Sequence, residues 1–207
     1  MALKKKKKSS VNSTDRRDNQ RSFKELSAEL HHQDTSARRW AARDIALLEG
    51  ATPILFTALK EEQEPVVIEA LFDALENIAT DEVVQGLMPM LRSEDTAKRN
   101  KVIEILQTMP DFVALYIIEL LNDTDSDVRI FAVDILQELA HPDTPKWLLS
   151  VLKDETHINV VATTVDRLAE VGTLDMLDEI QSLKDRFPNE PYLHFAIDLA
   201  LSRIKGE

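Results

Sequence analysis

The 207-residue chain has no cysteine, which excludes disulfide bonds, thiolate zinc sites and cysteine nucleophiles. It also lacks a long apolar run: the longest, Phe112 to Ile118, is far shorter than the roughly 20 residues that span a bilayer. The lysines at 4 to 8 resemble the start of a signal peptide, but polar residues follow where the apolar segment should be. We therefore expect a cytoplasmic protein that does not insert into a membrane.

Glycine and aromatic residues are also scarce, with four glycines and 5% aromatics. Leucine, alanine, isoleucine, aspartate and glutamate dominate, a balance that favours helix. No segment alternates between apolar and polar residues in the way that predicts paired strands. With 43% hydrophobic residues, the chain is long enough to bury a core, either in one or two ordinary domains or in one solenoid. The composition predicts an all-α protein.

The net charge of -12 is divided unevenly along the chain. Residues 1 to 21 hold eight basic and two acidic side chains, a net charge of +6 that leaves -18 for the rest. This predicts a disordered basic tail over 1–21 and a folded acidic domain over 22–205. The lysine run can contact nucleic acid, anionic lipid or an acidic partner, or fold back on the acidic domain as a lid. It can equally be a solubilising tail without a specific site.

A short motif returns every 30 to 32 residues, and it consists of an apolar residue, a carboxylate, any residue and a second apolar residue. A fixed period of this length predicts one supersecondary unit that is stacked several times. The copies are Phe72-Asp73-Ala74-Leu75, Ile103-Glu104-Ile105-Leu106, Val133-Asp134-Ile135-Leu136, Val165-Asp166-Arg167-Leu168 and, less perfectly, Ile197-Asp198-Leu199-Ala200.

The copy that contains Asp134 shows the repeating unit most clearly. Apolar residues from Val128 to Leu139 recur at i, i+3 and i+4 spacing, which predicts an amphipathic helix. His141-Pro142-Asp143 ends that helix, and Pro145 stands in the first turn of the next. The unit is therefore a helix, a short turn and a second helix. Alignment of the other copies predicts about twelve helices in six repeats.

Asp125 to Ala132 and Gln33 to Ala42 resemble the start of the inner helix in HEAT repeats of the short, phycobilisome-lyase HEAT-like type. The period of about 30 residues is similar to that variety. The resemblance covers about residues 22 to 205 and implies a right-handed α-solenoid of about six helical hairpins, of bacterial stand-alone type, with the motif helices on the concave face. Such repeats serve chromophore lyases, hydroxylases, DNA glycosylases and many scaffolds, so the resemblance leaves the function open.

On a helical wheel the motif carboxylate points away from the core, whereas the apolar residue before it lies on the flank that packs against an adjacent repeat. Stacked helices lie about 8 to 10 Å apart, so the carboxylates are expected to form a row about 40 Å long. Arg43 bounds it at the N-terminal end. The row is either a docking groove for a basic or amphipathic segment or a set of solvated positions. Its members are Asp73, Glu104, Asp134, Asp166 and Asp198, with Glu69 and Glu76 beside them.

Several catalytic interpretations are disfavoured. The resemblance implies His-Glu pairs in HEAT-like di-iron hydroxylases, and this sequence has none. An acidic face opposes the approach of nucleic-acid phosphates, which a glycosylase requires. The five histidines lack helical metal-ligand spacing, so we expect neither a metal nor a cofactor. Three aspartates each stand four residues before an arginine, and we interpret them as helix caps with a structural and not a catalytic role. The pairs are Asp34 with Arg38, Asp95 with Arg99, and Asp125 with Arg129.

The sequence thus predicts a non-enzymatic scaffold or adaptor that binds another protein, as a monomer or weak oligomer and without specific nucleic-acid binding. The expected role is that of an accessory subunit of a signalling or regulatory complex. The alternative is a bilin lyase or chromophore-binding subunit, which the family resemblance implies. Trp40 aligns with Phe131 and is expected to be packed, whereas Trp147 is expected to be partly exposed.

Overall fold

The computed structural model describes residues 21–206, and this part of the chain contains thirteen α-helices, two short 3-10 helices and no strand. The helices form six hairpins. The first helices are α1 (Phe23–Glu29), α3 (Ala51–Glu61), α5 (Asp81–Leu87) with η1 (Met88–Arg92), α7 (Pro110–Val113) with α8 (Ile117–Leu121), α10 (Thr144–Asp154), and α12 (Leu177–Arg186) after η2 (Leu174–Met176). The second helices are α2 (Thr35–Ile45), α4 (Pro65–Ile78), α6 (Thr96–Gln107), α9 (Ser126–Glu138), α11 (Ile158–Val171) and α13 (Pro191–Lys205).

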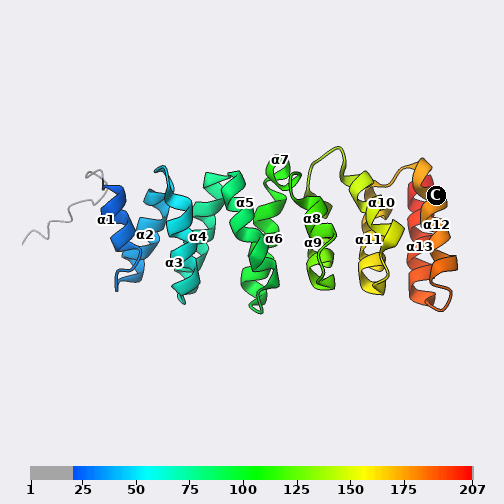
Figure 1. Ribbon diagram of the computed structural model, residues 1–207, viewed down its shortest axis with the longest axis horizontal. Coiled ribbons are helices and arrows are strands. Elements are labelled where there is room, and N and C mark those ends of the chain that lie inside the picture. Colours follow the sequence, from blue (N-terminus) through cyan, green and yellow to red (C-terminus); the bar gives the residue numbers. More distant parts are fainter. Residues whose placement is uncertain (1–20, 207) are drawn as a thin grey trace, which may run out of the picture.

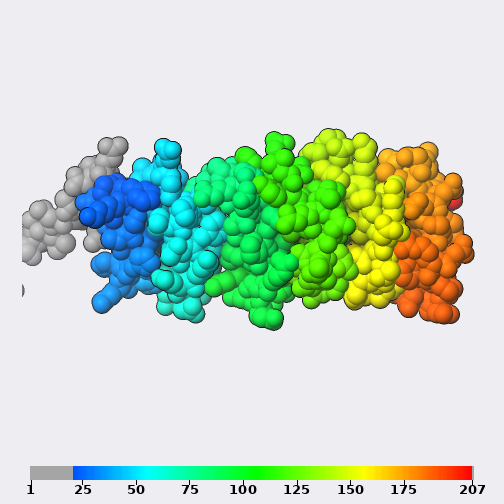
Figure 2. Space-filling model, viewed as in Figure 1, coloured from blue at the N-terminus to red at the C-terminus, as the bar shows by residue number. Residues whose placement is uncertain are grey.

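The hairpins are stacked in chain order along one axis, as Figure 1 shows. Each second helix packs on the first helix of its own hairpin and on the second helices of the neighbouring hairpins. The space-filling view shows the same order as successive colour bands from one end of the molecule to the other (Figure 2). The predicted α-solenoid is therefore confirmed. The tail predicted for residues 1–21 lies outside the described residues except for Arg21, which pairs with Glu29 and Asp44.

The first helices are less regular than predicted, which raises the helix count above twelve. After α5 the chain continues as the 3-10 helix η1, which contains Pro89. Proline lacks a backbone donor and clashes with the preceding turn, so an α-helix does not continue through it. The first helix of the fourth hairpin is interrupted between α7 and α8. Tyr116 lies in this break and donates a hydrogen bond to Asp81 at the start of α5.

Each second helix has two flanks that face opposite neighbours. The flank that carries the sixth and tenth residues faces the preceding hairpin: Lys101 of α6 lies near Asp73 of α4, and Arg167 of α11 near Asp134 of α9. On the other flank, Gln107 of α6 donates a hydrogen bond to the backbone carbonyl of Asp134 in the following hairpin.

This arrangement overturns the expectation for Trp40. Trp40 is the sixth residue of α2, so it lies on the flank that faces a preceding hairpin, as its counterpart Phe131 does in α9. In the described part of the chain no second helix precedes α2, and Trp40 is 43% exposed. Trp147 is partly buried, as expected, and stacks on His141 with 4.4 Å between ring centroids.

We predict that two Phe→Ala variants distinguish the packed flank of a second helix from its solvent-facing side. Phe72 is 1% exposed in α4, whereas Phe195 is 67% exposed in α13. Phe72→Ala should lower the free energy of unfolding by about 3 to 5 kcal/mol because it opens a cavity. Phe195→Ala should change it by about 0.5 kcal/mol or less. Urea unfolding followed by circular dichroism measures both, and equal losses would contradict the assigned flanks.

Candidate functional site

Four carboxylates of the motif occupy the same position on four consecutive second helices. Asp73, Glu104, Asp134 and Asp166 are each the ninth residue of their helix, in α4, α6, α9 and α11 respectively. Because these helices stack side by side, the four side chains follow one line along the array. We call these four residues the aligned row. The ninth residue of α2 is Arg43, so the line changes sign at its N-terminal end.

Asp198 does not lie in this line. It is the eighth residue of α13, and Leu199 is the ninth. Burial supports this register, because the tenth residues Ala74, Ile135 and Ala200 are all buried. Asp198 instead lies on the flank that would face a following hairpin, where it pairs with Lys184 of α12. The sequence also indicates this register. The earlier copies of the motif end in a leucine, and the matching leucine in α13 is Leu201, one residue after Ala200.

Two cations of the second helices approach the aligned row. The Lys101 Nζ atom lies 4.0 Å from Asp73 and 3.9 Å from Glu104. The Arg167 guanidinium lies 3.8 Å from Asp134. Pairs at these distances on partly exposed side chains are weak and screened by salt. They therefore reduce the negative potential of the row without cancelling it.

The members of the row differ in environment. Burial raises the pKa of Asp134 above its ordinary value, and the Arg167 guanidinium opposes that rise. Asp166 and Glu104 are exposed. Within residues 21–206, Asp166, Glu69 and Glu76 take part in no salt bridge. The least compensated negative charges thus belong to Asp166 on α11 and to Glu69 and Glu76, which lie on either side of Asp73 on α4.

A hollow of about 670 Å³ lies beside the start of the aligned row, between α2 and α4. Its wall brings Asp73 and Glu76 together with Arg43 and with Leu47, which is 85% exposed. Glu69 is exposed one turn before Asp73 on α4. The hollow therefore combines both signs of charge with an apolar side chain. The complete lining is Arg43, Ala46, Leu47, Asp73, Ala74, Glu76 and Asn77.

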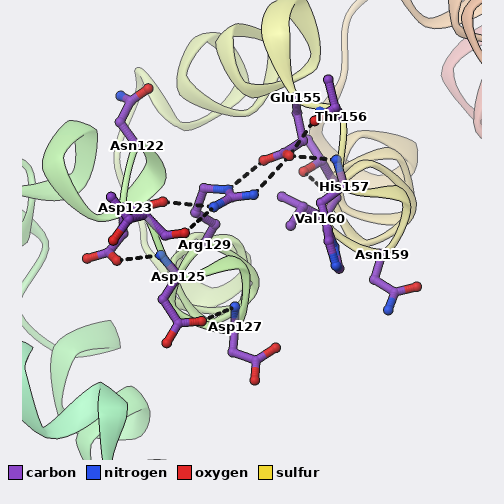
Figure 3. Close-up of polar contacts among 12 residues, drawn as sticks. Asn122, Asp123, Asp125, Asp127, Arg129, Glu155, Thr156, His157, Asn159 and Val160 are labelled. Atoms are coloured by element: carbon purple, nitrogen blue, oxygen red, sulfur yellow. Dashed lines mark hydrogen bonds and ion pairs between the residues drawn. The ribbon is translucent and has the colours of Figure 1, made fainter.

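A polar clamp holds the turn before α9 against the following hairpin (Figure 3). The Arg129 guanidinium donates two hydrogen bonds to Glu155, at 2.6 and 3.0 Å, and one to the Asp123 carbonyl at 2.8 Å. Glu155 also accepts hydrogen bonds from the backbone amides of Thr156 and His157 at the start of α11. The bidentate geometry fixes the distance and orientation between the two hairpins.

The same clamp is present three hairpins earlier. Arg38 donates to both carboxylate oxygens of Glu62, at 2.6 and 3.0 Å, and to the carbonyl of His32 at 2.8 Å. In the third copy the Arg99 guanidinium donates to the Ser93 carbonyl at 2.8 Å and lies over the ring of Phe131 at 4.9 Å. Two clamps and one cation–π contact thus connect successive hairpins through the same position, the fourth residue of α2, α6 and α9.

The predicted aspartate caps are confirmed, but the arginines bind other partners. Asp34, Asp95 and Asp125 accept hydrogen bonds from backbone amides in the first turns of α2, α6 and α9. The acceptors of the arginine clamps are Glu62 and Glu155, which sequence reasoning missed. A signal was available, because each glutamate directly follows a first helix and stands 24 or 26 residues after its arginine.

The clamp carboxylates have lowered pKa values. Desolvation by itself raises the pKa of Glu155, but the hydrogen bonds from the Arg129 guanidinium and from two backbone amides outweigh it. The same balance lowers the pKa of Glu62, with Arg38 as the principal donor. The same hydrogen bonds raise the pKa values of Arg38 and Arg129. Both clamps are therefore fully formed when these glutamates are ionised.

The described residues offer little for metal chemistry. Between residues 21 and 206, no group of three or more histidine, aspartate or glutamate side chains is placed to hold a metal ion. No helix in this range is long and apolar enough to cross a bilayer.

A comparison with protein-family models agrees with the repeat architecture. Residues 114–201, from the turn before α8 into α13, match the family model described as HEAT repeats. This match supports a HEAT-repeat protein and does not distinguish the phycobilisome-lyase-like type. Two crystal structures of engineered proteins are similar. The first is 19% identical in sequence, with a TM-score of 0.42, and the match covers 90% of this chain and 100% of the other. The second is 20% identical, with a TM-score of 0.41, and the match covers 88% of this chain and 58% of the other. No curated protein matches the chain.

We predict that the clamps make stability depend on acid pH. The folded-state pKa values of Glu62 and Glu155 lie below the unfolded value of about 4.3. Their contribution is therefore complete above that value and is lost as the pH falls through the folded-state pKa values. Glu62→Gln with Glu155→Gln should lower the free energy of unfolding at pH 7 by about 1 to 3 kcal/mol. It should also make the loss of stability below about pH 4.3 less steep.

Urea unfolding between pH 7 and pH 3 measures this effect. Glu119→Gln removes an exposed carboxylate of α8 outside the clamps and should leave the pH dependence as in the wild type. Parallel curves for the double variant and the wild type would show that the clamps do not contribute.

Proposed function

We propose that the protein is a non-enzymatic scaffold that binds a basic or amphipathic segment of another protein along the solvent side of its second helices. In this proposal the chain is a cytoplasmic accessory subunit of a larger assembly. Solenoid repeats present extended surfaces of this kind, because each unit contributes one strip of side chains to a common face. The HEAT-repeat match supports a protein partner of some kind.

The observation that carries the proposal is the aligned row. Packing explains the apolar residues of the motif, but it does not require a carboxylate at the ninth position of four second helices. The spacing of about 8 to 10 Å between stacked helices is comparable to the screening length of about 8 Å at physiological salt. Neighbouring charges therefore act together on a ligand that contacts several of them.

The hollow beside Asp73 favours an amphipathic segment over a purely basic one. Leu47 exposes 85% of its surface next to Arg43 and Asp73. When an apolar group covers an exposed leucine, apolar surface is removed from water and the free energy of the system falls. A segment with lysines or arginines on one side and an apolar residue at its end satisfies both features. The excess negative charge of the folded domain disfavours nucleic acid, whose phosphates would be repelled.

The experiment uses a fluorescein-labelled amphipathic peptide with lysines at every third position, and fluorescence anisotropy measures its binding. Asp73→Asn, Asp134→Asn and Asp166→Asn together should raise Kd about tenfold at low salt, because each exposed charge contributes a few tenths to 1 kcal/mol. Salt should weaken wild-type binding more than binding by the variant.

A matched control removes the same charge from the first helices. Glu82→Gln, Asp154→Asn and Asp178→Asn neutralise exposed carboxylates on α5, α10 and α12. This variant should bind the peptide nearly as the wild type does. Equal affinities of both triple variants and the wild type at all salt concentrations would refute the proposal. The chromophore-lyase alternative stays a prediction, and absorbance after mixing with bilin tests it.

A further inference from the structure

The last described helix carries a stripe of exposed apolar side chains. Tyr192, Phe195 and Leu199 are 77%, 67% and 40% exposed. They are the second, fifth and ninth residues of α13, and at 100° per residue they fall within about 60° of one another. We call these three residues the α13 stripe. Three large apolar side chains on one narrow strip of a helix are typical of a contact surface, whereas single exposed residues are ordinary.

The α13 stripe continues the line of the aligned row. Leu199 is the ninth residue of α13, as Asp166 is of α11 and Asp73 of α4. Phe195 occupies the fifth position, which Glu69 holds in α4. The ninth position is therefore acidic in the middle of the array and apolar on its last helix.

The opposite end of the line is basic. Arg39 and Arg43 hold the fifth and ninth positions of α2, and the Arg43 guanidinium lies over the ring of Trp40 at 5.5 Å from its centroid. Along the array from α2 to α13, one solvent-facing line thus presents positive, then negative, then apolar chemistry. Figure 1 shows these helices in this order along the long axis.

Building on the scaffold function, we propose that this line binds a single extended segment of a partner protein in one fixed placement. The segment sets an aromatic or large aliphatic residue on the α13 stripe and lysines or arginines on the aligned row. An acidic residue lies at Arg43. Charge complementarity selects this occupant, because basic side chains satisfy the row, and an apolar side chain loses no hydrogen bond on the stripe.

The spacing of the helices matches an extended chain. Three residues of a polyproline II segment rise about 9.3 Å and return a side chain to the same face. Stacked helices lie about 8 to 10 Å apart, so a lysine at every third residue meets one second helix each. Such a segment is also pre-extended, which lowers the entropy lost on binding.

Two labelled peptides of identical composition test the placement by fluorescence anisotropy. The first has glutamate, four lysines and phenylalanine in this order at every third position, with proline and alanine between them. The second has the phenylalanine between the second and third lysines. The first should bind about tenfold more tightly, because only its aromatic residue reaches the α13 stripe.

Variants assign that preference to the stripe. Phe195→Ala with Leu199→Ala should remove the difference between the two peptides while leaving the salt-dependent binding of the second. Leu115→Ala is the matched control, since Leu115 is 68% exposed but lies between α7 and α8. It should preserve the difference. The circular dichroism spectrum verifies that each variant is folded.

The outcomes separate this inference from the scaffold function. Salt-dependent but equal binding of both peptides would overturn the fixed placement and retain the scaffold. Absence of binding by either peptide would refute both. Sedimentation tests a second copy of this chain as the occupant: a concentration-dependent increase in mass that Phe195→Ala and Leu199→Ala abolish would show self-association through the stripe and overturn the inference.

Discussion

The packing of each second helix between its two neighbours is the constraint on which the structure depends. A helix in such a stack is mostly apolar toward its own first helix and along both flanks, as Phe72, Leu75 and Ala74 are in α4. Only the strip that includes the fifth and ninth residues remains in solvent. Selection for binding therefore acts on this strip, since changes elsewhere lower the stability of two hairpins at once.

Polar contacts add orientation to this apolar stack. The clamps from Arg38 to Glu62 and from Arg129 to Glu155 each join one hairpin to the next through a bidentate pair with little solvent exposure. Apolar contact alone lets helices slide over one another, whereas a bidentate pair has a narrow optimum of distance and angle. The clamps thus hold the second helices in the register that keeps the ninth positions in line.

Most of the fold was predictable from local patterns. The aspartate caps and the breaks at proline follow from residues within one turn of each other, and the period follows from the recurrence of one short motif. The solenoid was therefore correctly predicted. Features that depend on the ends of the stack or on contacts between hairpins were not. Trp40 has the sequence context of a core residue and is exposed because, within residues 21–206, no second helix precedes α2. Asp198 resembles the motif carboxylates in sequence but is the eighth residue of its helix, whereas the others are the ninth. Glu155 was overlooked because its partner Arg129 lies in the preceding hairpin.

The dependence of each hairpin on its immediate neighbours has a consequence for how such a chain can change. Duplication of one hairpin, for example α10 with α11, adds one carboxylate to the line and displaces α13 by one helix spacing. The aromatic residue required of a partner would then lie three residues farther from its lysines. Gene duplication and loss can therefore alter the length of the recognised segment in discrete steps, while every existing interface keeps its geometry.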